Sequence, residues 1–247
     1  MGDHASIRGW SADIARSLDA IGLPFDQGIV DRGRVARRAL ADYFRALVPE
    51  RRARSQADLL SGLLGAEEQG DKLTEPEVIA MCLLLFIAGH ETTVNLIGNG
   101  LLALLQHPEQ LAKVQADPGR VPNAIEELLR YDSPVQRTAR MPTTDVEIAG
   151  HRIDKGTMVV TALGAANRDP AQFPDPDRLD VTRRDVRHIS FGFGIHFCLG
   201  APLARVEGQI ALGALLRRAP RLMLAETTPE WRESSVLRGL KRLRVTF

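Results

Sequence analysis

Hydrophobic residues recur at helical spacing through the amino-terminal third of the chain. The first such segment is marked by Trp10, Ile14, Leu18 and Ile21. This spacing predicts a helix that ends in the Gly-Leu-Pro sequence at 22–24. An arginine-rich segment over about 28–52 has a similar apolar side and predicts a second helix, and a short third one is predicted over 59–64.

The longest predicted helix spans about 74–106. Thr74 and Glu77 have the spacing of a capping box, in which both side chains satisfy exposed backbone N–H groups, and Pro108 follows the predicted end. Apolar residues occupy all sides of the helix over 79–87, so we expect this part to be buried.

The pattern changes in the carboxyl-terminal half. Short apolar runs between glycine turns predict a small sheet, a stretch rich in Pro, Asp and Arg predicts an extended connector, and an alternating tail predicts a terminal strand. The small sheet is predicted over about 143–163, the connector over 167–187 and the terminal strand over 243–247. Helices are predicted on either side of the sheet and connector, over about 122–131 and 200–218. We therefore expect a mainly α fold with a minor β-sheet, and no clear boundary divides residues 1–247 into two domains.

The composition is that of an ordinary globular protein. Lys and Arg number 32 against 31 Asp and Glu, and this near-balance argues against a dedicated nucleic-acid-binding protein. The longest apolar run, 79–88, is shorter than the ~18 residues that suggest a membrane span, so no membrane association is expected. Cys82 and Cys198 provide no disulfide framework, which favours a cytoplasmic location.

The segment 191–200, Phe-Gly-Phe-Gly-Ile-His-Phe-Cys-Leu-Gly, is the first of three that could carry chemistry. Its glycines allow tight backbone geometry and the close approach of a flat group. Cys198 stands just before a predicted helix, whose amino terminus favours a thiolate. This thiolate could ligate iron, attack an electrophile with His196 as its base, or simply pack in the interior. The glycine spacing does not match a dinucleotide fingerprint.

The second segment, Ala-Gly-His-Glu-Thr-Thr at 88–93, lies inside the longest helix, where a stripe on one side is formed by Leu84, Ala88, Thr92, Asn95 and Asn99. Polar groups in an apolar helix need water, a ligand or protein partners. Glu91 and the Thr92 hydroxyl could relay protons to a bound ligand. Alternatively, Thr92 bonds the Ala88 carbonyl and Glu91 meets a surface cation. A zinc-protease motif is excluded because residue 94 is Val rather than His.

The third candidate is the pair Glu127 and Arg130, which lie three positions apart on a predicted helix. Taken alone, the spacing favours a solvated surface pair worth well under ~1 kcal/mol.

Together and in this order, these motifs resemble the cytochrome P450 family of heme-thiolate monooxygenases, in the style of its soluble bacterial members. The segment 191–200 resembles the family's cysteine loop, and 88–92 its oxygen-binding helix. Glu127 and Arg130 resemble its internal ion pair, and the sequence over 167–178 its meander. The fold implied by this resemblance is the carboxyl-terminal portion of the cytochrome P450 fold.

The resemblance implies a role for each matching residue. Cys198 would be the axial thiolate ligand of the heme b iron, and its electron donation favours O–O cleavage. His196 and Arg140 match contacts to the heme propionates. The other positions that the resemblance places at the heme are Ala88, Gly89, Phe191, Gly192 and Gly200.

The resemblance also assigns catalytic and structural residues. Thr92 and Glu91 match the pair that delivers protons during oxygen activation. Glu127 and Arg130 would be structural and would pair with Arg178 of the meander, so that the surface reading of this pair would not hold.

The implied reaction inserts one oxygen atom of O2 into a small organic substrate. The electrons would come from NAD(P)H through a separate ferredoxin-type protein, because the chain has no flavin or iron–sulfur segment.

The match begins in the middle of the family's pattern. The helices that normally precede the Trp10 helix have no counterpart, so we expect an amino-terminally truncated chain. The alternative to an active monooxygenase is therefore a catalytically inactive relative that binds heme weakly or not at all. Apolar surface left by the missing helices would favour self-association.

Overall fold

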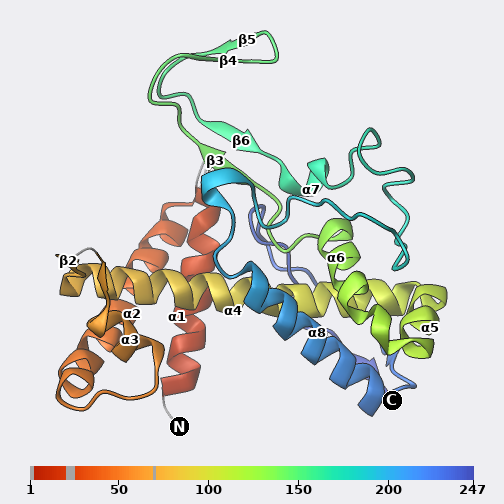
Figure 1. Ribbon diagram of the computed structural model, residues 1–247, viewed down its shortest axis with the longest axis horizontal. Helices are drawn as coiled ribbons and strands as arrows, with labels where there is room; N and C mark the ends of the chain where they lie inside the picture. The colour runs from red at the N-terminus through yellow and green to blue at the C-terminus, as the bar shows by residue number, and fades with distance from the viewer. Residues whose placement is uncertain (1–2, 21–25, 69–70) are drawn as a thin grey trace. The chain divides into compact units, whose positions relative to one another are not determined.

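The computed structural model describes residues 3–20, 26–68 and 71–247 (Figure 1). The chain divides into two compact units, which we call unit 1 (residues 1–91) and unit 2 (residues 92–247). The boundary falls inside the longest helix, α4 (Glu75–Gln106). The fold is mainly α-helical with a minor share of β-structure, as the sequence predicts.

Unit 1 consists almost entirely of helices. Before α4 it contains α1 (Asp3–Ser17), a 3-10 turn (Leu18–Ala20), α2 (Gln27–Ala53), α3 (Leu59–Gly65) and a short hairpin of β1 (Glu67–Glu68) and β2 (Asp71–Lys72). The carboxylates of Asp26 and Asp58 accept the N–H bonds of Gly28 and Ser61, which caps the starts of α2 and α3. The three predicted helices are therefore confirmed, while the predicted stop at 22–24 lies outside the described residues.

α1 and α2 pack closely because α2 has a glycine where the helices meet. A Cβ atom on Gly33 would lie 2.3 Å from the Cβ of Ser17, so a larger residue would push the two helices apart. One buried cluster of unit 1 is formed by Ile14, Ala36 and Leu40. A second joins α2, α3 and the first turns of α4 and is formed by Val48, Leu60, Val78, Ile79 and Cys82. Burial raises the pKa of the Cys82 thiol, so this cysteine packs as a neutral side chain.

The start of α4 has half of the predicted capping box. The Thr74 N–H donates to the Glu77 carboxylate at 2.8 Å, as expected. The Thr74 hydroxyl, however, donates to the same oxygen at 2.7 Å instead of accepting a helix N–H. These two bonds lower the pKa of Glu77.

The expectation that α4 is buried all round over 79–87 is wrong. Ile79 and Cys82 are buried, but Leu84 is 60% exposed. By length and composition α4 is also long and apolar enough to cross a membrane. The short apolar run 79–88 alone does not predict this. The core helices of water-soluble proteins share these properties, and the middle of α4 carries the buried polar residues Glu91, Asn95 and Asn99.

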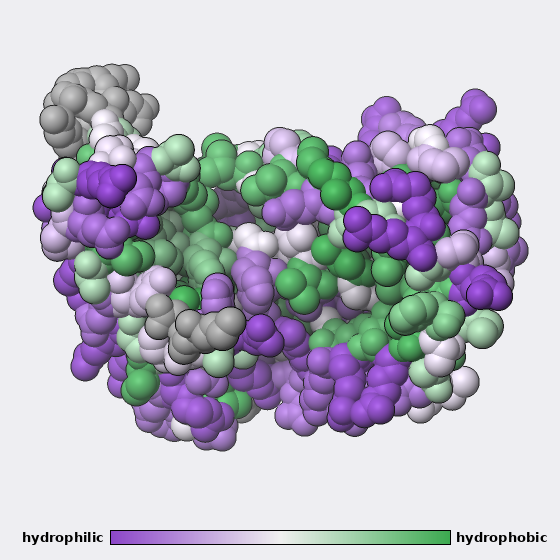
Figure 2. All heavy atoms as spheres, turned by 90° about the horizontal axis from the view of Figure 1, so that it is seen from below, coloured by the Kyte–Doolittle hydropathy of each residue, from purple (hydrophilic) through white to green (hydrophobic). Residues whose placement is uncertain are grey.

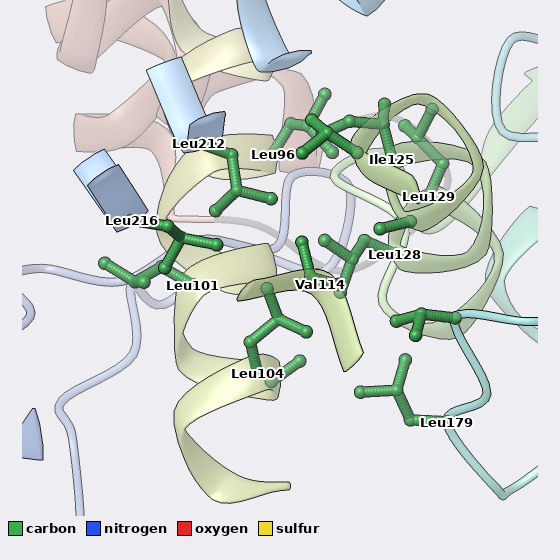
Figure 3. Packing of buried hydrophobic residues seen from close by; sticks show 14 of the residues in the cluster. Leu96, Leu101, Leu104, Val114, Ile125, Leu128, Leu129, Leu179, Leu212 and Leu216 are labelled. Carbon is green, nitrogen blue, oxygen red and sulfur yellow. The ribbon is translucent and has the colours of Figure 1, made fainter. Parts of the chain in front are cut away.

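Unit 2 is built around a core of leucines. It contains the rest of α4, then α5 (Pro108–Ala116), a 3-10 turn (Pro118–Arg120), α6 (Val121–Tyr131), α7 (Leu163–Ala166) and α8 (Ala201–Arg218). Figure 3 shows how the core side chains of α4, α6 and α8 face one another, among them Leu96, Leu101, Leu104, Ile125, Leu128, Leu212 and Leu216. A Cβ atom on Gly208 would lie 3.1 Å from Cδ1 of Ile125, so this glycine lets α8 approach α6.

The strands of unit 2 form separate two-stranded ladders instead of one sheet. The antiparallel pairs are β3 (Thr138–Arg140) with β6 (Val159–Thr161), β4 (Val146–Ile148) with β5 (His151–Ile153), and β7 (Met223–Leu224) with β8 (Val245–Thr246). The predicted sheet over 143–163 is thus two ladders, and the first begins at 138. The extended connector over 167–187 contains no helix or strand, and β8 confirms the terminal strand.

Candidate functional site

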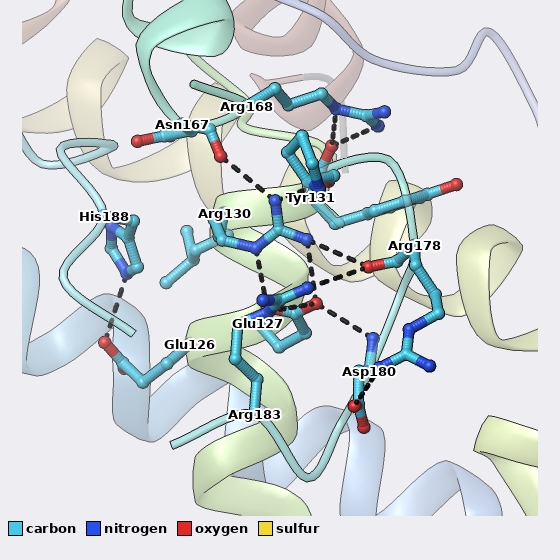
Figure 4. A network of polar contacts seen from close by, with 12 residues as sticks. Glu126, Glu127, Arg130, Tyr131, Asn167, Arg168, Arg178, Asp180, Arg183 and His188 are labelled. Atoms are coloured by element: carbon cyan, nitrogen blue, oxygen red, sulfur yellow. Dashed lines mark hydrogen bonds and ion pairs between the residues drawn. The ribbon is translucent and has the colours of Figure 1, made fainter. Parts of the chain in front are cut away.

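Glu127 and Arg130 lie at the centre of a buried polar network in unit 2 (Figure 4). Both side chains are 0% exposed, and two hydrogen bonds of 2.8 and 2.9 Å join them. The other N–H groups of Arg130 donate to three backbone carbonyls, those of Asn167, Pro176 and Arg178. All five guanidinium donors therefore have an acceptor, and the solvated surface pair favoured by the spacing alone is wrong.

The meander contributes the side chain of Arg183, not that of Arg178, to this network. The guanidinium of Arg178 is 65% exposed and donates to Asp180 at 3.2 Å. The Arg183 guanidinium is largely buried and lies 3.3 Å from Glu127. Arg178 does contact the buried pair, but through its carbonyl, which accepts from Arg130, while its side chain points toward solvent.

A chain of hydrogen bonds connects this network to the segment 191–200. Asn167 is fully buried, and its Oδ1 accepts the Ile189 N–H at 2.8 Å. Its Nδ2 donates to the Ser190 hydroxyl at 2.8 Å, and Ser190 donates in turn to the Leu129 carbonyl of α6 at 2.7 Å. The ion pair therefore fixes the backbone that leads into the cysteine loop.

Cys198 lies at the end of a tight loop, directly before α8. Gly192 and Gly194 have φ values of +74° and +65°, which favour glycine. The Cys198 N–H donates to the Phe191 carbonyl at 2.9 Å, so the loop closes on itself. Gly200 is the N-cap of α8, and the Cys198 thiol is exposed.

A second ion pair lies beside this loop and was not predicted from the sequence. Arg205 of α8 donates two hydrogen bonds to Glu126, at 2.7 and 2.9 Å, and the His188 ring lies 3.2 Å from the same carboxylate. Burial raises the pKa of Glu126, but the bonds from His188 and Arg205 outweigh it and lower the pKa to about 2. The only signal in the sequence was the position of an arginine on the helix that follows the cysteine.

Arg205 also connects the ion pair to the loop itself. Its guanidinium lies over the Phe191 ring, 4.6 Å from the centroid. The hydrogen bond to Glu126 raises the pKa of Arg205, and the charge of Cys198 raises it further. A cation is thus held within electrostatic reach of a Cys198 thiolate.

His196 and Arg140 are both exposed. His196 ends a 3-10 turn (Gly194–His196), and Arg140, the last residue of β3, donates to the Ala139 carbonyl at 2.8 Å. Within the described residues neither side chain is paired with a carboxylate, so both are open to an anionic ligand.

The structure gives no support to Cys198 as a nucleophile with His196 as its base. His196 ends a 3-10 turn, Gly194–His196, and Cys198 follows this turn. In the part of the chain that the structure describes, no hydrogen bond joins the two side chains.

The motif at 88–93 lies in the middle of α4, where the residues change from exposed to buried along the chain. Ala88 and Gly89 are exposed, and a Cβ atom on Gly89 would meet no atom within 4 Å, so there is open space beside this turn. Glu91 is buried in unit 1 and accepts a hydrogen bond from Ser11 at 2.7 Å. Thr92, the first residue of unit 2, is half-buried.

Asn95 and Asn99, the last two residues of the polar stripe on α4, lie against protein backbone. Asn99 donates to the Arg238 carbonyl at 3.0 Å. A Cβ atom on Gly239 would lie 1.9 Å from Oδ1 of Asn95, so only glycine fits there without displacing the amide. Asn99 therefore bonds the turn at 238–239, and the Asn95 amide packs closely against it.

Comparison with known proteins identifies the family. The family model for cytochrome P450 matches residues 23–247 and runs through the boundary between the two units without a break. The chain belongs to the cytochrome P450 family. Heme b is the cofactor of this family, in which a cysteine thiolate is an axial ligand of the iron.

Bacterial cytochromes P450 are similar to this one over most of its length. The biotin biosynthesis cytochrome P450 of Bacillus subtilis is 45% identical over 99% of this chain, and cytochrome P450 107B1 of Saccharopolyspora erythraea is 51% identical over 84%. The chain spans 61% of the first relative and 52% of the second.

Solved structures agree with these relatives. Mycobacterium smegmatis CYP164A2 with econazole bound is 45% identical and superposes with a TM-score of 0.93. P450BioI, in complex with an acyl carrier protein ligated to hexadec-9Z-enoic acid, is 44% identical with a TM-score of 0.92. This chain covers 62% of each of these two structures.

The residues of the loop fit the cofactor of a cytochrome P450. Heme is a large apolar plate that carries two carboxylates. The loop presents exposed apolar side chains around the Cys198 thiol, namely Phe193, Ile195, Phe197 and Leu199. Arg140 and His196 supply exposed groups that can bind carboxylates. The donor set therefore suits heme b.

Proposed function

We propose that this chain is a heme-thiolate monooxygenase with Cys198 as the iron ligand. The observation that carries this proposal is the exposed Cys198 thiol, which is held at the start of α8 by a closed glycine loop and surrounded by exposed apolar side chains. When bound, heme supplies reductive activation of O2. One oxygen atom enters the substrate, the other leaves as water, and NAD(P)H provides the two electrons.

The cofactor-binding roles rest on these placements and on the motifs. Arg140 and His196 would bind the heme propionates, and the Gly192 turn and Gly200 would let the plate approach the backbone. Phe191 would support the loop through its contact with Arg205. Glu127 and Arg130 would be structural, because their network fixes the backbone that enters the loop.

The oxygen-side roles rest on the sequence of α4. Ala88 and Gly89 would leave space for O2, because no side chain fills the region beside Gly89. Glu91 and Thr92 would hold and move the protons that the reaction consumes, since a carboxylate next to a hydroxyl can pass protons between them.

We further propose the setting in which the chain works. The chain would form one partial cytochrome P450 domain over residues 1–247, which the family match over residues 23–247 supports. A ferredoxin-type protein would deliver the electrons, and the substrate would be a small organic molecule. We place the protein in the cytoplasm, with no nucleic acid or membrane as a partner.

Self-association is a further proposal for this chain. Figure 2 shows hydrophobic residues gathered in patches on one face of the molecule. On α8, three residues at helical spacing are exposed: Leu203 by 60%, Val206 by 50% and Ile210 by 66%. A second copy of the chain could cover this apolar stripe.

Heme binding tests the function directly. The purified chain is mixed with hemin, reduced, exposed to carbon monoxide and examined by absorption spectroscopy. We expect the long-wavelength Soret band of a thiolate-ligated heme. A chain that retains no heme would overturn the proposal and identify an inactive relative.

The two cysteines provide a matched pair of variants. Cys198→Ala should abolish the thiolate-type band, while Cys82→Ala should retain it because Cys82 is buried in the core of unit 1. Circular dichroism of both variants checks that the helices remain. A thiolate-type band in Cys198→Ala would disprove the assigned ligand.

A further inference from the structure

The buried carboxylate of Glu91 is held by a residue 80 positions away in the sequence. Ser11, in the middle of α1, donates its hydroxyl hydrogen bond to Oε1 of Glu91 at 2.7 Å. Ser11 is 0% exposed and Glu91 is 3% exposed. Removing a carboxylate from water is costly unless polar groups meet it, so the hydroxyl offsets part of this cost.

Hydrophobic packing fixes Ser11 opposite Glu91. The residues one position before and three positions after Ser11, Trp10 and Ile14, belong to the cluster that α1 forms with α2. Phe86 and Ile87, which lie about one turn before Glu91 on α4, pack against the same cluster. The close contact between Gly33 of α2 and Ser17 adds to the packing of α1 against α2. The hydroxyl is therefore placed by a rigid part of unit 1.

His90 reaches the same carboxylate oxygen from the solvent side. Its Nδ1 lies 3.4 Å from Oε1 of Glu91, and its side chain is 43% exposed. The ring stacks on Phe86, with the ring centroids 6.0 Å apart. Oε1 thus lies between an inner hydroxyl, which is fixed, and an outer imidazole, which is in contact with water.

We propose that Ser11 is a positioning residue for proton delivery by Glu91. Its hydroxyl holds Oε1 toward α1 and thereby sets the orientation of the carboxylate that directly precedes Thr92. The inference rests on the proposed function, because the protons in question are those consumed by the monooxygenase reaction. Ser11 acts through Glu91 alone, so its loss should slow proton transfer while leaving heme binding intact.

The first test measures the contact itself in the heme-free chain. Ser11→Ala and Glu91→Gln are made singly and together, and their unfolding free energies are measured in urea. The two changes should be non-additive, because Ser11→Ala removes the donor of this bond and Glu91→Gln removes the charge of its acceptor. Ser17→Ala is the matched control: it removes a hydroxyl of the same helix that bonds the Ile14 carbonyl, and it should add independently to Glu91→Gln. Additivity between Ser11 and Glu91 would overturn the proposal.

The second test measures proton delivery in the heme-loaded chain. With a ferredoxin-type donor and its reductase in excess, NADH oxidation is followed in H2O and in D2O, and hydrogen peroxide is measured. Ser11→Ala should raise the solvent isotope effect by about twofold or more and increase the peroxide formed per NADH, because the proton step becomes slower. Ser11→Thr, which keeps a hydroxyl, should restore both values, and Ser17→Ala should not change them.

The outcomes separate the two proposals. A chain without bound heme overturns the monooxygenase function and, with it, the role of Ser11. If heme binds normally and Ser11→Ala leaves both the isotope effect and the peroxide yield unchanged, the positioning role alone is wrong.

Discussion

At the scale of single residues, Arg130 depends on the full shape of its guanidinium. Five N–H groups meet five acceptors, and two of these are the oxygens of one buried carboxylate. Lysine at this position keeps the charge but offers three donors from a single point. Arg130→Lys should therefore lower the unfolding free energy by about 2–4 kcal/mol, measured by urea unfolding of the heme-free chain.

An exposed arginine provides the control for this change. Arg152 bridges Asp145 and Asp154, but its side chain is 74% exposed. Arg152→Lys should change stability by no more than about 0.5 kcal/mol. Equal losses at the two positions would show that burial of the Glu127–Arg130 pair has no energetic consequence.

Glu126 provides a prediction about acid sensitivity. Its pKa in the folded chain is about 2, below the ordinary 4.5, since bonds from His188 and Arg205 outweigh burial. A lowered pKa gives stability that is present above about pH 4.5 and is lost as the pH falls toward 2. Glu126→Gln should thus be less stable at neutral pH, by at most about 3 kcal/mol, and should match the wild-type chain near pH 2.

The measurement is a series of urea unfolding curves between neutral and acid pH. Glu207→Gln, which removes an exposed carboxylate of α8, is the control and should shift stability little at any pH. A constant difference between Glu126→Gln and the wild-type chain across the series would contradict the assigned pKa.

Single residues also show what a sequence reveals about a site. Cys198 and its glycines stand together in the sequence, so both the loop and its place before α8 were predictable. The spacing of Glu127 and Arg130 revealed a pair but not its burial, because burial depends on carbonyls from the distant meander. Because the meander is distant in the sequence, the spacing does not show that Arg183 supplies the neighbouring guanidinium, and for the same reason the sequence gives no signal for Ser11.

At the scale of elements, the contact between α1 and α2 depends on one glycine. Gly33→Ala should destabilise the chain by about 1–3 kcal/mol, because the new Cβ would lie 2.3 Å from that of Ser17. The cost of this clash outweighs the gain in helix propensity. Adding Ser17→Gly should restore part of the loss by removing the atoms that clash. Thermal and urea unfolding of the heme-free chain measure both effects.

Gly62 offers a matched helical glycine without a neighbour. A Cβ atom there would meet nothing within 4 Å, so Gly62→Ala in α3 should be neutral or stabilising by up to about 1 kcal/mol. If Gly33→Ala were equally well tolerated, the close approach of α1 and α2 would not be a constraint on the sequence.

The elements themselves were predictable where local chemistry defines them. The ends of α4 and α6 fall within about a residue of the predicted limits, because capping residues and prolines mark them. The burial of α4 was not predictable in the same way. An apolar run shows which residues could be buried. The sides that pack against a partner depend on helices elsewhere in the chain, and Leu84 stays 60% exposed.

At the scale of the whole molecule, α8 is apolar on two sides while only one is packed. Gly208, Leu212 and Leu216 face the core of unit 2, whereas Leu203, Val206 and Ile210 are exposed. A helix that is apolar all round is typical of a buried position. Nothing in the described part of the chain covers the second side.

We therefore expect the isolated chain to self-associate through this stripe, as sedimentation velocity over a series of protein concentrations would show. Leu203→Gln with Ile210→Gln should weaken association at least about tenfold, because burying each side chain contributes about 1.5–3 kcal/mol. Met223→Gln, which alters an exposed apolar residue of β7, should leave association unchanged. A chain that stays monomeric at every concentration would show that the stripe tolerates water, and equal effects of all three substitutions would indicate non-specific aggregation instead of a defined interface.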